Sequence, residues 1–177
     1  MAKTTNLLFT GVGGQGTILT TKLLSNALVD AGYDVKMSEI HGMAQRGGTV
    51  NTQLKYGDKV YAPNIGEGEA DYVIAFEKAE ALRALPYLKD GGVVLTDERE
   101  IYSMPVLLGQ AEYPHGWLKE TEYNVKVIPA YEIAEKLGSA RDSNIVMLGA
   151  VSKLLGIAVT LPPKFNAKAF DAGREAV

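Results

Sequence analysis

The most unusual stretch of the sequence, residues 38–49, concentrates side chains that can perform chemistry. An acid, an imidazole, an amide and a guanidinium fall within eight residues, at Glu39, His41, Gln45 and Arg46. A guanidinium binds phosphate or carboxylate through two parallel hydrogen bonds. An imidazole accepts or donates a proton near neutral pH. We therefore take His41 and Arg46 as candidate catalytic residues, with proton transfer and anion binding as the expected chemistry.

Each of these residues also has a purely structural interpretation. His41 could hydrogen-bond a backbone carbonyl, and Arg46 could form an ion pair with Glu39. A metal site is not expected, because His41 and His115 are the only histidines and no cysteine completes a ligand set. A nucleophilic triad is not expected either, since Ser38 lacks a Gly-x-Ser-x-Gly context.

A second chemical signature lies at residues 11–16, which read Gly-Val-Gly-Gly-Gln-Gly. This spacing, after a strand and before a helix, lets a phosphate approach the N–H groups that open the helix. The candidate anion- or cofactor-binding residues are Gly11, Gly13, Gly14, Gln15, Gly16 and Thr17. Glu39 lies roughly 20 residues further on, where a ribose-binding acid is expected, so a nicotinamide- or flavin-binding enzyme is an alternative. A second alternative is that the glycines only allow a tight turn and close packing.

Alternating strand and helix patterns must position these two signatures. Residues 6–10 predict a buried strand, residues 17–31 an amphipathic helix ending at Gly32, and residues 34–38 a second strand. This order indicates a βαβ unit with a parallel sheet. Loops after the carboxyl ends of such strands line the binding crevice. We therefore expect the loop 39–48 to face the glycine turn across that crevice.

The remaining elements continue the pattern with one insertion. Residues 49–56 alternate between outward and inward side chains, and Gly57-Asp58 predicts a turn into residues 59–62, giving an antiparallel hairpin. Strands at 72–76, 92–96 and 125–128 and helices at 78–85 and 131–137 follow. Helix 144–155 is apolar nearly all round, so we expect it to be buried on several sides, with Gly149 permitting close approach of another element. The expected fold is a single α/β domain with one doubly wound, mostly parallel, Rossmann-like sheet and an inserted antiparallel hairpin.

Composition restricts the class of protein. The 177 residues suit one domain, and 46% hydrophobic residues can build a core. A formal charge of −3 disfavours non-specific nucleic-acid binding. No apolar run is long enough to cross a bilayer and no signal-peptide pattern is present, so we expect a cytoplasmic protein. The sequence has no cysteine and hence no thiolates for iron–sulfur clusters; in a redox complex another chain would carry the electrons.

Taken together, the two signatures resemble the gamma module of the 2-oxoacid:ferredoxin oxidoreductases. The reading His-Gly-Met-x-Gln-Arg-Gly-Gly at 41–48 is similar to the indolepyruvate branch. Two later motifs agree, Asn-Ile-Val-Met-Leu-Gly at 144–149 and Asn-x-Lys-Ala-Phe at 166–170. The resemblance covers nearly the whole chain, so residues 1–177 are expected to form one pyruvate/ketoisovalerate oxidoreductase gamma-type domain. Only the segment at 157–162 is shorter than is usual in that family.

The resemblance implies an activity and a division of labour. The family oxidatively decarboxylates a 2-oxoacid with coenzyme A, giving an acyl-CoA, carbon dioxide and reduced ferredoxin. Thiamine diphosphate performs the carbanion chemistry and iron–sulfur clusters accept the electrons; in the indolepyruvate branch both belong to the large alpha subunit. This chain would then hold no cofactor tightly, would be inactive alone, and would shape the substrate or coenzyme A side of the site. The loop 39–48 would be its main functional surface, ordered by the alpha subunit. The remaining alternatives are the stand-alone nucleotide-binding oxidoreductase and a scaffold that binds no ligand.

Overall fold

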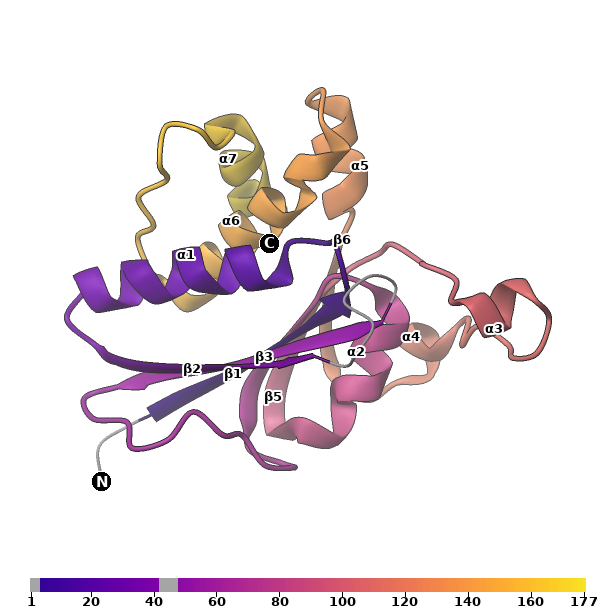
Figure 1. Ribbon diagram of the computed structural model, residues 1–177, viewed down its shortest axis with the longest axis horizontal. Helices are drawn as coiled ribbons and strands as arrows, with labels where there is room; N and C mark the ends of the chain where they lie inside the picture. Colours follow the sequence, from indigo (N-terminus) through magenta and orange to yellow (C-terminus); the bar gives the residue numbers. More distant parts are fainter. Residues whose placement is uncertain (1–3, 42–47) are drawn as a thin grey trace.

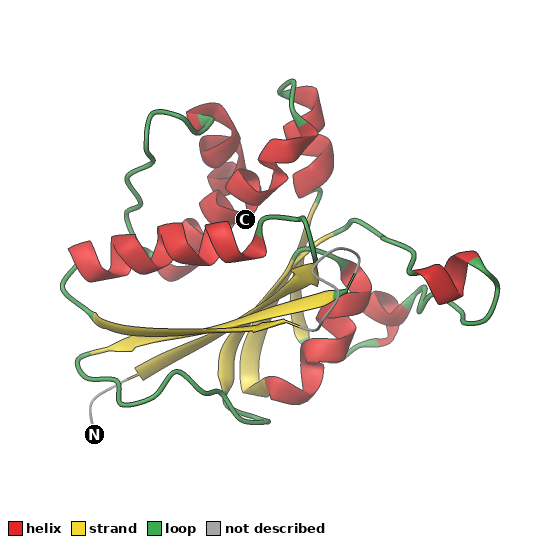
Figure 2. Cartoon of the chain, in the orientation of Figure 1, coloured by secondary structure: helices red, strands yellow, loops and turns green. Residues whose placement is uncertain are grey.

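The computed structural model describes residues 4–41 and 48–177. In it a six-stranded sheet lies between two layers of helices (Figures 1 and 2). The long helix α1 (Thr17–Asp30) runs across one face, and α2 (Lys78–Ala84) packs on the other. The α/β class and the doubly wound arrangement predicted from the sequence are confirmed.

The six strands have the spatial order β2-β3-β1-β4-β5-β6. Their bounds are Thr4–Val12 (β1), Asp34–His41 (β2), Thr49–Gly57 (β3), Ala70–Ala75 (β4), Leu88–Asp97 (β5) and Asn124–Ile128 (β6). The neighbours β1, β4, β5 and β6 are parallel, whereas β3 runs antiparallel to both β1 and β2. Side chains at the centre of β1 and β4, such as Leu7, Phe9 and Ile74, are fully buried, as is typical of strands covered on both faces.

The antiparallel hairpin differs from the predicted one in its partners. Residues 59–62 form no strand, and β3 instead pairs with β2 on one side and β1 on the other. All nine residues of β3 pair with β1, from Thr4 opposite Gly57 to Val12 opposite Thr49. A four-residue return strand could not satisfy so many backbone groups. The hairpin is therefore β2–β3, and β1 and β2 keep parallel directions without pairing directly.

Two helical layers bury two apolar clusters. On one face α1 packs with α5 (Ala130–Lys136), α6 (Ser143–Leu155) and α7 (Ala167–Glu175) around Phe9, Leu28 and Met147. On the other face α2, the 3₁₀ turn Leu85–Tyr87 and α4 (Trp117–Glu120) cover Leu8 and Val73. The short elements α3 (Met104–Leu107) and the 3₁₀ turn Ala140–Asp142 lie in connecting segments. No helix in either described range is both long and apolar enough to cross a membrane.

Helix α6 lies in the centre of its layer, as its uniformly apolar sequence predicts. Nine consecutive residues, 144–152, are buried. Its contact with α7 is backbone against backbone: a Cβ on Gly149 would lie 2.0 Å from the carbonyl oxygen of Phe170, and one on Gly173 would lie 1.9 Å from that of Val146. The predicted close approach at Gly149 is confirmed, and its partner is α7. The short segment that follows α6 packs partly buried apolar side chains, Ile157 among them, on the same core.

Candidate functional site

The carboxyl ends of β1 and β4 define the candidate site. The helix after β1 covers one face of the sheet and the helix after β4 covers the other, which opens a crevice between the two connections. Three cavities, of about 560, 750 and 490 Å³, reach this edge of the sheet, and Val12 at the end of β1 lines all of them. A further cavity beside Trp117 lies at the opposite ends of the strands and shares no lining residue with the glycine turn.

The glycine turn joins β1 to α1 and needs glycine for two separate reasons. Gly14 and Gly16 have φ angles of 101° and 81°, in the left-handed region that a Cβ disfavours. At Gly11 and Gly16 space is also short: a Cβ on Gly16 would lie 2.6 Å from Nδ2 of Asn144, and one on Gly11 would lie 2.8 Å from Oγ1 of Thr17. The alternative that the glycines allow close packing therefore applies to Gly11 and Gly16. Gly13 and Gly14 line the cavities on both sides of the turn.

Gln15 fastens the glycine turn to the sheet. Its Oε1 accepts a hydrogen bond from the Val12 N–H at 2.7 Å, and its Nε2 donates one to the Phe76 carbonyl at 2.6 Å. The amide thus links the ends of β1 and β4, the two strands that flank the crevice. The same bonds occupy both ends of the side chain, so its observed role is to position the turn.

Among the predicted residues of the turn, Thr17 has a side-chain hydroxyl that forms no hydrogen bond with the described residues. Its side chain is 3% exposed, and Oγ1 has no hydrogen-bond partner among the described residues. The first N–H groups of α1 also lack helical acceptors, as at any helix N-terminus. On this side the cavity of about 560 Å³ is bordered by Lys22 and Glu39, which form an ion pair at 3.2 Å. Orphaned donors at a helix N-terminus favour an anionic or strongly accepting ligand.

On the other side of the turn the cavity of about 750 Å³ is basic. Arg99 and Arg141 line it together with residues 12–16, and its described lining contains no carboxylate. The Arg99 guanidinium lies over the Tyr131 ring, 4.1 Å from the ring centre, which fixes its orientation. Two guanidiniums facing a glycine turn are suited to phosphate or carboxylate groups. Neither arginine was predicted from the sequence, although Arg99 lies two residues after the end of β5, where crevice residues are expected.

Asp97 fixes the backbone of the residues that line the basic cavity, Arg99 and Tyr131 among them. It is the last residue of β5, is 2% exposed, and accepts a hydrogen bond from the Tyr131 N–H at 3.5 Å. Burial raises its pKa to about 6, opposed by hydrogen bonds from the backbone N–H groups of Tyr131, Arg99 and Ala130. The carboxyl group therefore ties the start of α5 and the backbone of Arg99 to the end of the sheet.

The structure places the other predicted residues as follows. His41 is the last residue of β2 and pairs with Val50 of β3. Arg46 lies outside the described residues. Glu39 is within β2, not after it, and its observed partner is Lys22. Because β3 separates β2 from β1, Glu39 sits one strand further from the glycine turn than the ribose-binding acid of a dinucleotide fold.

No group of three or more His, Asp or Glu side chains is arranged to hold a metal ion within residues 4–41 and 48–177. Fold and crevice together define a doubly wound α/β protein with a glycine turn between its first strand and first helix, and with Glu39 paired to Lys22 at the border of the adjoining cavity. The chain belongs to the pyruvate ferredoxin/flavodoxin oxidoreductase family, whose profile matches residues 6–176.

The relatives and solved structures that resemble this chain are subunits of oxidoreductases of the same kind. The indolepyruvate oxidoreductase subunit IorB of Pyrococcus horikoshii is 39% identical over 191 aligned positions, which cover 97% of this chain and 95% of that protein. The same subunit of Archaeoglobus fulgidus is 42% identical, over 81% of this chain and 74% of that protein. The crystal structure of a keto/oxoacid ferredoxin oxidoreductase gamma subunit from Geobacter sulfurreducens aligns over 97% of both chains, with 26% identity and a TM-score of 0.70. The predicted resemblance to gamma-type subunits, and within them to the indolepyruvate branch, is confirmed.

Proposed function

We propose that this chain is the small subunit of a thiamine-dependent 2-oxoacid:ferredoxin oxidoreductase that acts on indolepyruvate or a related arylpyruvate. The observation that carries the proposal is the similarity to IorB subunits over almost the entire length of both proteins. The reaction is oxidative decarboxylation to an acyl-CoA, carbon dioxide and reduced ferredoxin. The partner is a large alpha subunit that holds thiamine diphosphate and iron–sulfur clusters, and ferredoxin is reached through the complex.

This division of labour is consistent with the chemistry of the chain. Iron–sulfur clusters need thiolates, and the sequence contains no cysteine, so its residues do not fit a cluster. Thiamine diphosphate, bound to the partner, would supply the stabilised carbanion. We place the protein in the cytoplasm and expect it to lack activity by itself.

Coenzyme A is the ligand we assign to the glycine turn. Its phosphates match the donors there: the N–H groups that open α1, the orphaned Oγ1 of Thr17, and the guanidiniums of Arg99 and Arg141 on the basic side. These residues would bind and orient the co-substrate, while Gln15 holds the turn in place. We keep His41, at the end of β2, and Arg46 as catalytic candidates on their sequence pattern, and we propose that the alpha subunit contacts this part of the chain.

The other interpretations are weaker. A stand-alone nicotinamide or flavin enzyme would need an acid free to bind ribose, and Glu39 is paired with Lys22. A scaffold without a ligand would leave the donor-rich cavity at Arg99 and Arg141 without a role.

The substrate range of the complex tests the proposal. The chain and its alpha subunit are produced together, and coenzyme A-dependent reduction of ferredoxin is measured with indolepyruvate, phenylpyruvate, pyruvate and 2-oxoglutarate. We expect kcat/KM to be highest for the aryl substrates, by about tenfold or more, as is achievable by apolar pocket contacts. A preference for pyruvate or 2-oxoglutarate would contradict the assignment to the indolepyruvate branch.

A further inference from the structure

A cavity of about 490 Å³ adjoins the basic cavity and shares Val12 and Ile101 with it. It is enclosed by α2, the start of β3 and the segments 101–106 and 111–114. Among the residues that the structure describes, its charged lining consists of three carboxylates, Glu77, Glu80 and Glu112, and one guanidinium, Arg83. The cavity is therefore acidic, whereas the neighbouring one is basic.

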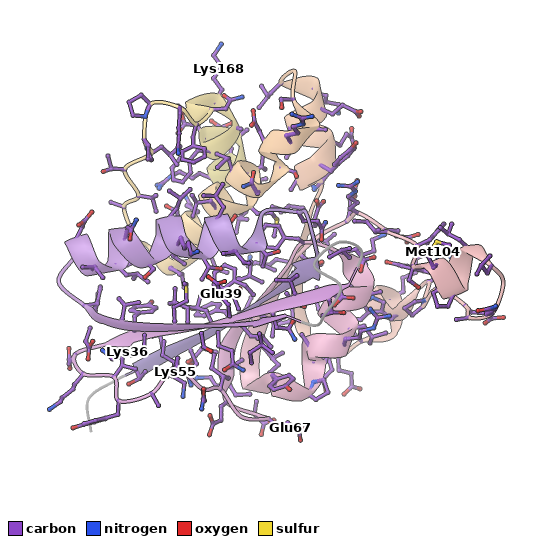
Figure 3. The ribbon with its side chains drawn as sticks, viewed as in Figure 1. Lys36, Glu39, Lys55, Glu67, Met104 and Lys168 are labelled. Carbon is purple, nitrogen blue, oxygen red and sulfur yellow. The ribbon has the colours of Figure 1, made fainter. Side chains whose placement is uncertain are left out.

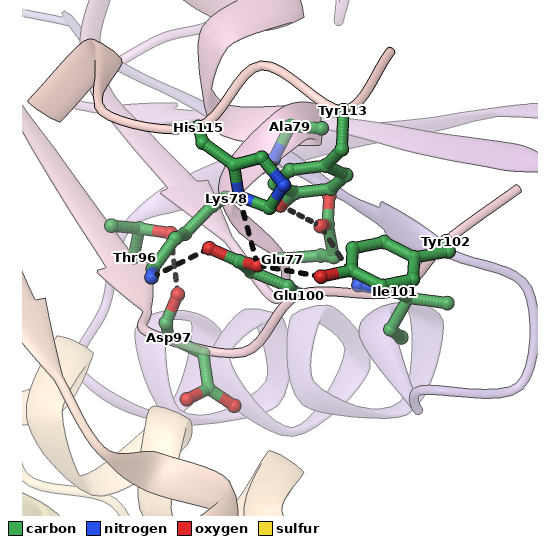
Figure 4. Close-up of polar contacts among 10 residues, drawn as sticks. All are labelled: Glu77, Lys78, Ala79, Thr96, Asp97, Glu100, Ile101, Tyr102, Tyr113 and His115. Atoms are coloured by element: carbon green, nitrogen blue, oxygen red, sulfur yellow. Dashed lines mark hydrogen bonds and ion pairs between the residues drawn. The ribbon is translucent and has the colours of Figure 1, made fainter. Parts of the chain in front are cut away.

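Glu77 lines this cavity, and its carboxylate oxygens have hydrogen-bond donors within the chain. It is 1% exposed and accepts hydrogen bonds from the N–H groups of Glu80 at 2.9 Å and Ile101 at 3.1 Å. The Tyr113 hydroxyl donates a further hydrogen bond to it and accepts one from the Ala79 N–H at 3.2 Å (Figure 4). This network fixes the 101–113 segment on the start of α2, so the cavity is a built feature of the fold.

Glu80, in contrast, is not satisfied. Its side chain is 3% exposed, and only Oε1 has partners, the Thr49 hydroxyl at 3.2 Å and the Arg83 guanidinium. The Oε2 atom is buried and has no hydrogen-bond partner among the described residues. A buried carboxylate oxygen without a donor is costly, so an oxygen left in this state calls for a donor from beyond the described residues.

The rim of the cavity is apolar and exposed. Met104 and Pro105 at the start of α3 line the cavity, and Met104, Leu107 and Leu108 are 63%, 62% and 62% exposed. Figures 1 and 3 show α3, with Met104, projecting away from the body of the molecule. An exposed group of large apolar side chains marks a protein-binding surface. The occupant is therefore a protein segment that carries a cation among apolar residues.

We propose that α3 and the Glu80 cavity form a docking site for the alpha subunit, with an Arg or Lys side chain of that subunit donating to Oε2 of Glu80. The proposal rests on the proposed function, which supplies the partner. The choice of the alpha subunit over a second copy follows from position: Val12 and Ile101 line both this cavity and the basic cavity assigned to coenzyme A. Whatever fills the acidic cavity therefore abuts the site that the alpha subunit has to complete.

The test compares the stability of the complex with that of the free subunit. Glu80→Gln keeps the shape of the side chain and removes its charge, and Leu107→Asp places a charge on the exposed rim. Each variant is produced with a tagged alpha subunit, and the Kd of the complex is measured by dilution and mass photometry. We expect each change to weaken the complex by about tenfold or more, because desolvated charge pairs and apolar anchors dominate interface energies. The melting temperature of the free small subunit should stay within about 2 °C of wild type, as for surface and near-isosteric changes.

Two matched controls accompany the variants. Glu132→Gln removes a carboxylate from another helical ion pair, with Lys136, and Tyr61→Asp charges another exposed apolar residue, 84% exposed; both should leave the Kd unchanged. A lowered melting temperature of Glu80→Gln with an unchanged Kd would make Glu80 an internal structural residue and overturn the proposal. An effect of Leu107→Asp on the Kd without an effect of Glu80→Gln would also overturn the proposal. So would the finding that the variants disrupt dimers of the small subunit and leave its complex with the alpha subunit intact. Failure of the wild-type chain to bind the alpha subunit at all would overturn the proposed function as well.

Discussion

Replacing Gly173 by alanine should abolish or severely weaken folding of the small subunit. The new methyl group would lie 1.9 Å from the carbonyl oxygen of Val146 and 2.7 Å from its carbonyl carbon. Both are backbone atoms of the buried helix α6, so neither can rotate away. The helices α6 and α7 would have to separate, which breaks the contact of Phe170 with the core. We expect a loss of at least about 3 kcal/mol in the free energy of unfolding, at the upper end of overpacking effects, measured by urea denaturation.

Gly68→Ala is the matched control for this prediction. Gly68 has a φ of +71° and open space where a Cβ would lie, so alanine there adds only backbone strain of roughly 1 kcal/mol. If Gly173→Ala and Gly68→Ala cost the same, the backbone contact between α6 and α7 does not determine the stability of this layer.

Removing both arginines of the basic cavity should raise the KM for coenzyme A of the assembled complex by at least about 100-fold. Arg99 and Arg141 line the same cavity as the glycine turn, and no carboxylate is present in its described lining. Charge-assisted hydrogen bonds of this kind are worth about 1.5–3 kcal/mol each. Because they would hold a phosphate that does not react, Arg99→Ala with Arg141→Ala should leave kcat nearly unchanged. Steady-state kinetics with coenzyme A as the varied substrate measures both constants.

Lys168→Ala is the control for loss of a positive charge away from the crevice. Lys168 is exposed on α7, at the outer surface of the helical layer (Figure 3). Its loss lowers the positive charge without touching the crevice, so the KM for coenzyme A should not change. Equal KM values for wild type and the double arginine variant, with normal melting of the free subunit, would contradict the assignment of coenzyme A to this cavity.

Local patterns predicted those parts of the fold that depend on neighbours in the chain. The strand, glycine turn and helix at residues 6–31 follow from spacing and apolar periodicity, and the burial of α6 follows from its lack of a polar face. The pairing of β3 could not be read in this way, because its alternating pattern suits any partner and the choice of β1 depends on long-range register.

The site was predicted in part for the same reason. The glycine spacing identifies the turn from the sequence alone. Arg141 lines the cavity beside this turn from a 3₁₀ turn roughly 125 positions later in the chain, and no local sequence pattern indicates that proximity. Gln15 and Thr17 have equally polar side chains, and only the geometry separates their roles. Gln15 is fully bonded within the turn, whereas Oγ1 of Thr17 is left without a partner.

Spectroscopy and activity of the separated and mixed subunits test the proposed division of labour between the two chains. The small subunit and the alpha subunit are purified apart, and their visible absorbance and indolepyruvate- and coenzyme A-dependent ferredoxin reduction are measured alone and together. We expect no iron–sulfur absorbance and no turnover for this chain, which has no cysteine, and full activity only for the mixture. Turnover of indolepyruvate by the isolated chain, or an alpha subunit that is equally active without it, would contradict the proposed division of labour.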